Sequence, residues 1–222
     1  MIRDIRAIAQ LKKYSELYNV IIIVGATIMM IIINLITGLS ELSVEDLRIL
    51  IPVVVASIFF GFSIFFKVFL MVDEVPRGLS FGMTRRKLFA YSRVVDFFEI
   101  LVVAFLVWGI SIDVSFGLVM KIAVLCYGVI LWVEGIAGNS VLRYGKVAYW
   151  IYYIALMVVC IGFPRLSGFF PVVGDVFATM IDAIITPVYN QGMLWSAILG
   201  FAAVGMLINW ITFRKIPVNS VT

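Results

Sequence analysis

The chain has 222 residues, of which 64% are hydrophobic and 14% are charged, and its net charge is +4. A soluble globular domain is about half apolar and about a quarter charged, so a water-soluble core of this size could not bury so much apolar surface. The composition excludes an ordinary soluble domain and predicts that a lipid bilayer surrounds much of the chain. Because the apolar runs are continuous rather than alternating, we expect α-helical spans and not the strands of a barrel. The whole chain, residues 1–222, is expected to form a single all-α transmembrane domain.

The residue types of common catalytic sites are missing. The sequence contains no histidine, which is the commonest general base and metal ligand. It also lacks a Gly-rich phosphate loop with a Walker lysine, so the chain itself is not expected to hydrolyse nucleotides. Cys126 and Cys160 lie inside apolar runs and are interpreted as buried free thiols rather than as a disulfide or a metal site. We therefore expect no enzyme activity and no catalytic, cofactor-binding or metal-ligating residues.

The N-terminal residues 1–17 are predicted to form a helix that lies in the membrane interface. At helical spacing, the side chains separate onto an apolar face with Ile2, Ile5 and Ala9 and a polar face with Arg3, Arg6, Gln10 and Lys13. This distribution is typical of an interfacial amphipathic helix. Lys12 departs from the pattern because it falls on the apolar side.

Six apolar segments are each expected to cross the membrane as a helix. A helix needs about 20 residues to cross a hydrocarbon core of about 30 Å. The expected spans cover about residues 20–36, 51–72, 97–112, 118–137, 148–163 and 194–213. The third and the fifth are short by this measure.

The distribution of basic residues predicts the orientation of these spans. Most of the 17 lysines and arginines fall in the N-terminal segment, in the connections between spans two and three and between spans four and five, and in the C-terminal tail. Lysine and arginine are enriched in the cytoplasmic connections of membrane proteins. The sequence therefore predicts that both termini are cytoplasmic. The basic residues are explained by orientation, so no nucleic-acid partner is expected.

The connection between spans five and six, residues 164–193, is too apolar for a solvated loop. It is expected not to span because it is interrupted by Pro164, Pro171, Gly174 and Pro187. Within it, Asp175, Thr179 and Asp182 recur at helical spacing among apolar residues. We interpret the segment as a re-entrant or interfacial helix at the outer face. The alternative is an ordinary surface helix packed over the spans.

Ionisable residues within or beside the spans are costly in hydrocarbon and are candidates for function. Those that share one membrane level on the cytoplasmic side are Lys67, Asp96, Glu99 and Glu134. We predict a charge network among them that braces the helices; the alternative is a proton or ion relay. For Lys67 and Lys121 a further alternative is that each ammonium group reaches the interface along its own alkyl chain.

Small residues in the spans permit helices to approach closely. They are Gly61, Gly128, Gly135, Gly200, Ala202, Ala203 and Gly205. Packing within one chain and pairing between two copies explain them equally well.

The connection between spans two and three, residues 76–93, carries the most informative pattern. Gly82 is expected to break the chain, and Thr84 is expected to cap a helix that begins at Arg85. That helix mixes basic and apolar side chains, namely Arg85, Arg86, Lys87, Leu88 and Phe89. One interpretation is that it holds anionic lipid headgroups. The other is that it presses into a groove on a soluble partner.

This pattern resembles a known family. The stretch from Gly82 to Phe89, GMTRRKLF, is similar to the Gly-x-Ser/Thr-Arg-Arg/Lys-x-x-Phe/Tyr pattern in the cytoplasmic connection between spans two and three of ABC-2 type transporter permeases. The expected interfacial helix, six spans and apolar re-entrant segment also resemble that family. The resemblance implies that residues 82–93 form a coupling helix that docks on a separate ATPase subunit. The residues implied in coupling are Gly82, Thr84, Arg85, Arg86, Lys87, Leu88 and Phe89.

The resemblance also implies a transporter of two permease copies, as a homodimer or a pair of close homologues, and two ATPase subunits. ATP and Mg²⁺ then bind the ATPase subunits and not this chain. The chain looks like the small bacterial plasma-membrane permeases that export hydrophobic peptides, bacteriocins or lipid-like compounds. The scarcity of deep polar residues likewise favours an amphipathic or apolar cargo. The alternatives are an ATP-independent carrier and a non-transporting membrane partner, such as an immunity or sensory protein.

Overall fold

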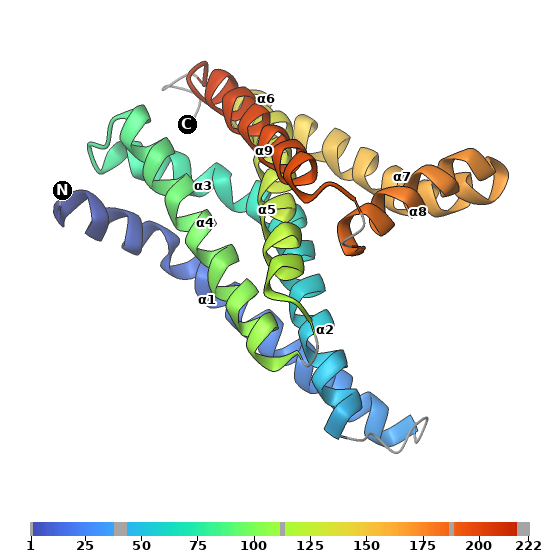
Figure 1. Cartoon of the computed structure of the whole chain (residues 1–222). Coiled ribbons are helices and arrows are strands. Elements are labelled where there is room, and N and C mark those ends of the chain that lie inside the picture. The colour runs from blue at the N-terminus through green and yellow to red at the C-terminus, as the bar shows by residue number, and fades with distance from the viewer. Residues whose placement is uncertain (1, 38–43, 112–113, 187–188, 217–222) are drawn as a thin grey trace. The chain divides into compact units, whose positions relative to one another are not determined.

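The computed structural model describes residues 2–37, 44–111, 114–186 and 189–216, and these residues form helices and no strands (Figure 1). In chain order the elements are α1 (Ile2–Thr37), α2 (Val44–Phe65), α3 (Lys67–Ser80), α4 (Arg85–Ile110), α5 (Phe116–Val133), the π-helix η1 (Glu134–Gly138), α6 (Asn139–Tyr144), α7 (Lys146–Phe169), α8 (Pro171–Ile185) and α9 (Gln191–Phe213). The prediction of an all-α chain is confirmed for the described residues. The chain divides into two compact units, Met1–Ala123 and Val124–Ser220, and the boundary falls inside α5.

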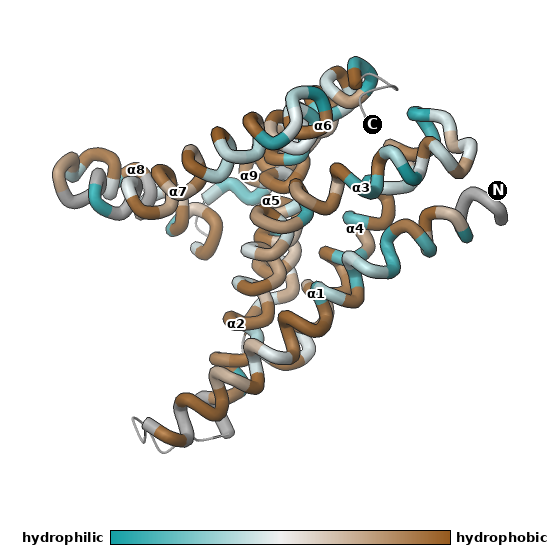
Figure 2. Tube along the Cα trace, turned by 180° about the vertical axis from the view of Figure 1, so that it is seen from behind, coloured by the Kyte–Doolittle hydropathy of each residue, from teal (hydrophilic) through white to brown (hydrophobic). Residues whose placement is uncertain are grey.

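Four helical stretches among the described residues are long and apolar enough to cross a membrane. They are Arg6–Ile33, Leu47–Phe65, Phe116–Tyr144 and Gln191–Phe213, and a shorter apolar stretch covers Lys146–Gly162. These stretches indicate a membrane protein, and their hydrophobic residues stand out along α1 and α2 in Figure 2. The expected third span lies in α4 and does not meet this test. The reason is that Arg93, Asp96 and Glu99 leave too short an uncharged stretch before α4 ends at Ile110.

In the first unit, α1 packs against α2, α3 and α4. The sequence predicts an interfacial helix over residues 1–17 and a separate span from residue 20. The structure instead has one uninterrupted helix, because no glycine or proline occurs before Gly25 to end the first segment. Ile8, Leu11, Lys12 and Ser15 are buried along one side of α1. The face of the N-terminal helix that carries Lys12 among apolar residues therefore packs against other helices, and it includes polar residues.

The helices α2 and α3 are separated only by Phe66. Helical hydrogen bonds continue across it, from Phe66 N to Phe62 O at 2.8 Å and from Leu70 N to Phe66 O at 3.0 Å. The expected second span, residues 51–72, therefore covers the end of one helix and the start of the next. Lys67 lies at this junction, where it is buried.

In the second unit, the end of α5 from residue 124 continues without a break into η1 and α6, and α9 packs against η1 and α6. Glycines make this approach possible. A Cβ on Gly135 would lie 3.0 Å from the Asn209 Cα, and one on Gly205 would lie 2.8 Å from Trp132 Cδ1. Gly200, in contrast, has no atom within 4 Å of an added Cβ. Packing within the chain thus explains Gly135 and Gly205 but not Gly200.

The helices α7 and α8 pack against each other (Figure 1). The helix α7 continues through Pro164 to Phe169, beyond the expected end of the fifth span at residue 163, although its apolar stretch ends at Gly162. A proline inside a helix removes one hydrogen bond, which membrane helices tolerate. Pro171 occupies the start of α8, where a backbone N–H would have no acceptor within the helix, so its absence costs no hydrogen bond. The expected helix around Asp175 and Asp182 is α8, whereas Pro187 lies outside the described residues.

Candidate functional site

The turn between α3 and α4, with the first turn of α4, forms what we call the elbow, residues 81–89. Gly82 adopts φ +77°, a conformation that glycine reaches without steric cost. The Thr84 hydroxyl accepts a hydrogen bond from Lys87 N at 3.4 Å and caps α4. The break at Gly82 and the cap at Thr84 agree with the sequence prediction. Contrary to that prediction, the helix that follows is not a short separate element but the beginning of α4, which runs to Ile110.

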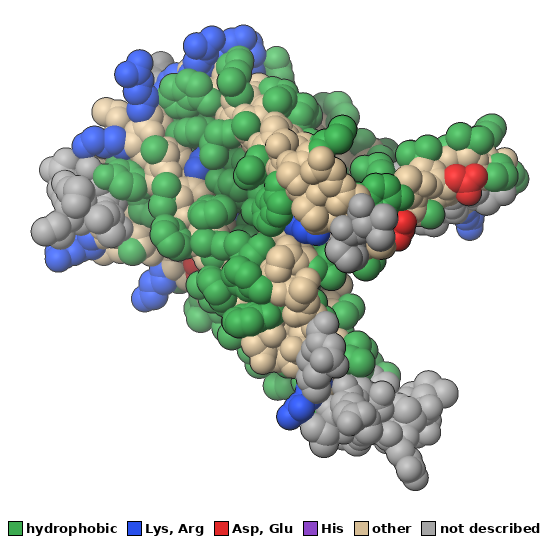
Figure 3. All heavy atoms as spheres, viewed as in Figure 1, with side chains coloured by type: hydrophobic (Ala, Val, Ile, Leu, Met, Phe, Trp, Pro, Cys, Tyr) green, Lys and Arg blue, Asp and Glu red, His purple; other side chains and the backbone are tan. Residues whose placement is uncertain are grey.

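The elbow is held to the rest of its unit by apolar contacts. Leu88 is 2% exposed, and a Cβ on Gly78 would lie 2.6 Å from Leu88 Cδ1, so α3 and α4 approach closely here. Met83 is also buried. Leu88 therefore positions the elbow and does not present its side chain to a partner, as the sequence had suggested. Arg86 and Lys87 are exposed, and Figure 3 shows lysine and arginine side chains gathered at this end of the first unit.

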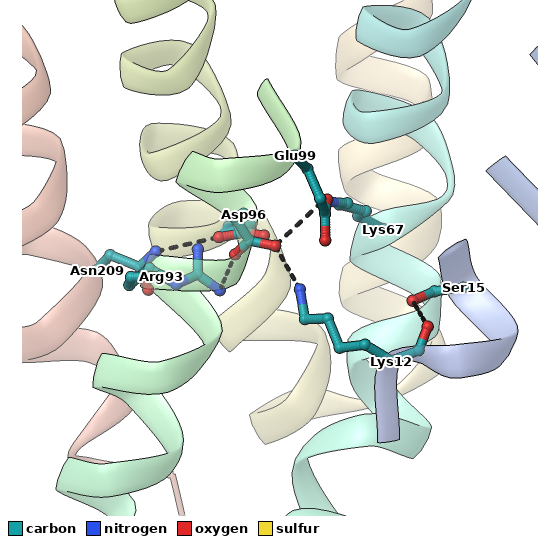
Figure 4. Close-up of polar contacts among 8 residues, drawn as sticks. Lys12, Ser15, Lys67, Arg93, Asp96, Glu99 and Asn209 are labelled. Atoms are coloured by element: carbon teal, nitrogen blue, oxygen red, sulfur yellow. Dashed lines mark hydrogen bonds and ion pairs between the residues drawn. The ribbon is translucent and has the colours of Figure 1, made fainter. Parts of the chain in front are cut away.

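Five charged side chains from α1, α3 and α4 form what we call the ion cluster: Lys12, Lys67, Arg93, Asp96 and Glu99 (Figure 4). Lys12 of α1 donates a hydrogen bond to Asp96 Oδ1. Lys67 Nζ lies 3.1 Å from the same oxygen and 2.5 Å from Glu99 Oε2. Arg93 Nη2 lies 3.2 Å from the other oxygen, Asp96 Oδ2.

Burial makes the ion cluster energetically important. The Asp96 side chain is 0% exposed, and those of Lys12 and Lys67 are 7% and 6% exposed. Removing a charge from water costs several kcal/mol per ion in proteins, so a buried ion persists only when partners and hydrogen bonds compensate it. Three cations around one carboxylate keep Asp96 ionised. The cluster thereby ties α1, α3 and α4 together.

The second unit contains a separate polar cluster beside the π-helix η1. Asn139 Nδ2 donates to Asn209 Oδ1 at 3.0 Å and to Thr212 Oγ1 at 2.7 Å. Asn209 Nδ2 lies 3.4 Å from Glu134 Oε2. Glu134, Asn139 and Asn209 are all buried. Turns of π-helix are frequent at functional positions, and this one carries Glu134 at its first residue.

The structure brings together three of the four residues expected in one charge network. Lys67, Asp96 and Glu99 meet in the first unit, whereas Glu134 belongs to the second unit and contacts Asn209. Lys12 and Arg93 were missed as members. The sequence did contain an indication for Lys12, because it is the one charged residue on the apolar face predicted for its helix.

Other candidate residues stand apart from these clusters. Lys121 is buried in this structure. Cys126 and Cys160 are free thiols as expected, but Cys160 is exposed and only Cys126 is partly buried. The described residues contain no group of three or more His, Cys, Asp or Glu side chains placed to hold a metal ion.

Comparisons of this chain with protein-family models, with curated protein sequences and with solved structures gave no match. The elbow and the buried polar clusters are therefore the features from which function is proposed.

Proposed function

We propose that this chain is the transmembrane permease subunit of an ATP-driven, ABC-2 type exporter in a bacterial plasma membrane. The observation that carries the proposal is the elbow. A glycine turn and a capped helix start place the exposed Arg86 and Lys87 at the tip of a helix that continues into apolar residues. A basic helix tip of this kind suits docking on the acidic surface of a soluble ATPase.

Six membrane spans fit this proposal. The four long apolar stretches supply four of them, and the apolar part of α4 after Asp96 and the apolar stretch Lys146–Gly162 supply the others. Six spans place both termini on the cytoplasmic side together with the elbow, in accord with the basic residues there. The helix α8 then lies at the outer face as the re-entrant element between spans five and six.

The continuity of α4 suggests how docking acts on the membrane part. A closure of the ATPase pair pushes on the elbow, and Leu88 and Gly78 transmit the push because they pack without a gap. The helix α4 extends without interruption from Arg85 to Ile110, so it moves as a rigid rod. The ion cluster lies on this rod and links its movement to α1 and α3.

The cargo proposed is a hydrophobic or amphipathic compound, such as a peptide or a lipid-like molecule. Large apolar side chains are exposed along α1, α7 and α9, for example Ile28, Val158 and Leu207. Such surfaces suit lipid, a second copy of the permease and an apolar cargo better than a hydrophilic solute. ATP and Mg²⁺ bind the ATPase partner in this scheme.

The proposal is tested by photo-crosslinking at the elbow. A photoreactive residue in place of Arg86 is expected to capture a soluble polypeptide that binds ATP and carries Walker motifs. The same residue in place of Arg143, an exposed arginine at the end of α6, serves as the matched control. In parallel, the triple change Arg85→Ala, Arg86→Ala and Phe89→Ala is expected to abolish copurification of ATPase activity while membrane insertion persists.

Two outcomes reject this function. One is unchanged ATPase copurification and transport in the triple variant. The other is labelling of a cysteine at position 86 only from outside the cell, which reverses the proposed orientation. Either result leaves an ATP-independent carrier or a non-transporting membrane partner as the function to pursue.

A further inference from the structure

One further contact between α1 and α4 lies beside the ion cluster, and it joins two acids. The two helices pack against each other and run in the same direction along the first unit (Figure 1). In α1, Glu16 follows Lys12 by four residues, so the two side chains share one face of the helix. In α4, Glu99 follows Asp96 by three residues and shares its face in the same way. The hydrogen bond from Lys12 to Asp96 therefore places Glu16 opposite Glu99 about one turn further along.

The carboxyl groups of Glu16 and Glu99 lie within hydrogen-bonding reach of each other. Each has one buried oxygen, Oε1, that has no hydrogen-bond donor when both groups are ionised. An ionised carboxylate only accepts hydrogen bonds, whereas a protonated carboxyl group also donates one. Two carboxylates in contact, with little water between them, repel each other strongly. A single proton removes one of the two charges and supplies the missing donor.

The neighbouring lysines do not replace this proton. Lys12 and Lys67 face Glu16 and attract its charge. Among the described residues, however, their ion pairs go to Asp96 and Glu99 and not to Glu16. The Glu16 carboxyl group is therefore the one acid of the region that lacks a direct ionic partner, and its closest polar neighbour is another acid.

The charge balance of the region permits both the protonated and the ionised state. Six ionisable side chains from α1, α3 and α4 gather here: Lys12, Glu16, Lys67, Arg93, Asp96 and Glu99. The helix α2, which also packs against α1 and α4, has no ionisable residue from Ile49 to Phe65. Three cations and three acids are neutral together when every carboxyl group is ionised, and one shared proton leaves one positive charge. Neither state carries a large net charge, so the proton is exchangeable.

We propose that Glu16 and Glu99 share one proton at neutral pH and form a proton-binding site that holds α1 against α4. Lys67 Nζ, at 2.5 Å from Glu99 Oε2, favours the ionised form of Glu99, so Glu16 carries the proton and donates it in a hydrogen bond to Glu99. When the pH rises, the proton leaves, and the two carboxylates repel each other across the contact between the helices. The attachment of α1 to α4 thus depends on pH, which goes beyond the exporter function and does not rest on it.

The experiment is infrared difference spectroscopy of the purified full-length chain in lipid nanodiscs, recorded between neutral and alkaline pH. A protonated carboxyl group has a C=O stretching band that a carboxylate lacks. We expect the wild type to lose the band of one protonated carboxyl group per chain as the pH rises. Glu16→Gln and Glu99→Gln are each expected to abolish this loss, because the shared proton requires both groups. Asp73→Asn, which changes an exposed acid of α3, is the matched control and should leave the band unchanged.

Three results would overturn the proposal. One is a wild-type spectrum without a protonated carboxyl band. Another is a band that Glu16→Gln retains, which assigns the proton to a different acid, such as the buried Glu134. The third is a band that Glu99→Gln retains, which shows that Glu16 holds the proton alone.

The wild-type band keeps the proposal testable even if Glu99→Gln does not fold. A carboxyl group that donates to a carboxylate absorbs at lower frequency than an isolated one, so a band at the frequency of an isolated carboxyl group would also overturn the shared site. No ATPase subunit takes part in these measurements, so their failure is distinct from failure of the proposed exporter function.

Discussion

Replacement of Asp96 by asparagine tests the structural importance of the ion cluster. The Asp96 carboxylate forms ion pairs with Lys12, Lys67 and Arg93, and the Asp96 side chain is 0% exposed. Asparagine keeps the shape but removes the charge, so Lys12 is left in a buried position without its carboxylate. Breaking a buried ion pair from one side costs about 3–5 kcal/mol. Because Lys67 keeps Glu99 at 2.5 Å, we expect Asp96→Asn to lower the free energy of unfolding by about 3 kcal/mol, at the low end of that range.

The loss is measured as the change in free energy of unfolding in lipid or detergent, by steric trapping or by denaturant titration. The double variant Lys12→Met with Asp96→Asn removes the stranded ammonium group and is expected to recover much of the loss. The control Asp73→Asn, at an exposed position, is expected to change stability by less than about 0.5 kcal/mol. Two results would refute the view that Asp96 compensates buried cations. One is a loss of less than about 1 kcal/mol in the free energy of unfolding for Asp96→Asn. The other is a double variant whose loss equals the sum of the losses of the two single variants.

Three glycines and one helix cap give four further predictions. Gly135→Ala places a Cβ 3.0 Å from the Asn209 Cα, and we expect it to lower the free energy of unfolding by about 1–2 kcal/mol. Gly200→Ala, with open space around the added atom, is expected to be neutral or stabilising when both glycine variants are measured by denaturant titration. Gly82→Ala is expected to cost about 1–2 kcal/mol because of its φ of +77°, measured in that assay too. Thr84→Ala is expected to cost about 1 kcal/mol and to speed amide hydrogen exchange in the first turn of α4.

Local features of the sequence predicted much of the fold. Continuous apolar runs located the long helices, because burial in lipid demands both length and apolar composition. Gly82 and Thr84 marked the end of one helix and the start of the next, since each acts on its own backbone. Pro164 shows the limit of such local signals, because a proline disfavours a helix on its own backbone and α7 nevertheless continues to Phe169.

Contacts between distant helices could not be predicted in the same way. Lys12 stood out on an apolar face, yet its partner Asp96 is 84 residues away, and only the packing of α1 against α4 brings them together. Asn139 and Asn209 are 70 residues apart, and neither shows a pattern among its neighbours that indicates the other. The oxygens of Asn19 and Ser63 look like ordinary polar residues until the packed helices leave them without partners.

The π-helix of the second unit has a consequence for chain length. A turn with i→i+5 bonding holds one residue more than the α-helical turn it replaces. Deleting a single position within Glu134–Gly138 would restore ordinary α-helical bonding and leave the helix that follows near its present orientation, because the π turn takes up the extra residue locally. Asn139 would then still face Asn209. Homologous chains with a one-residue gap at this place in an alignment are accordingly expected to keep the amide pair.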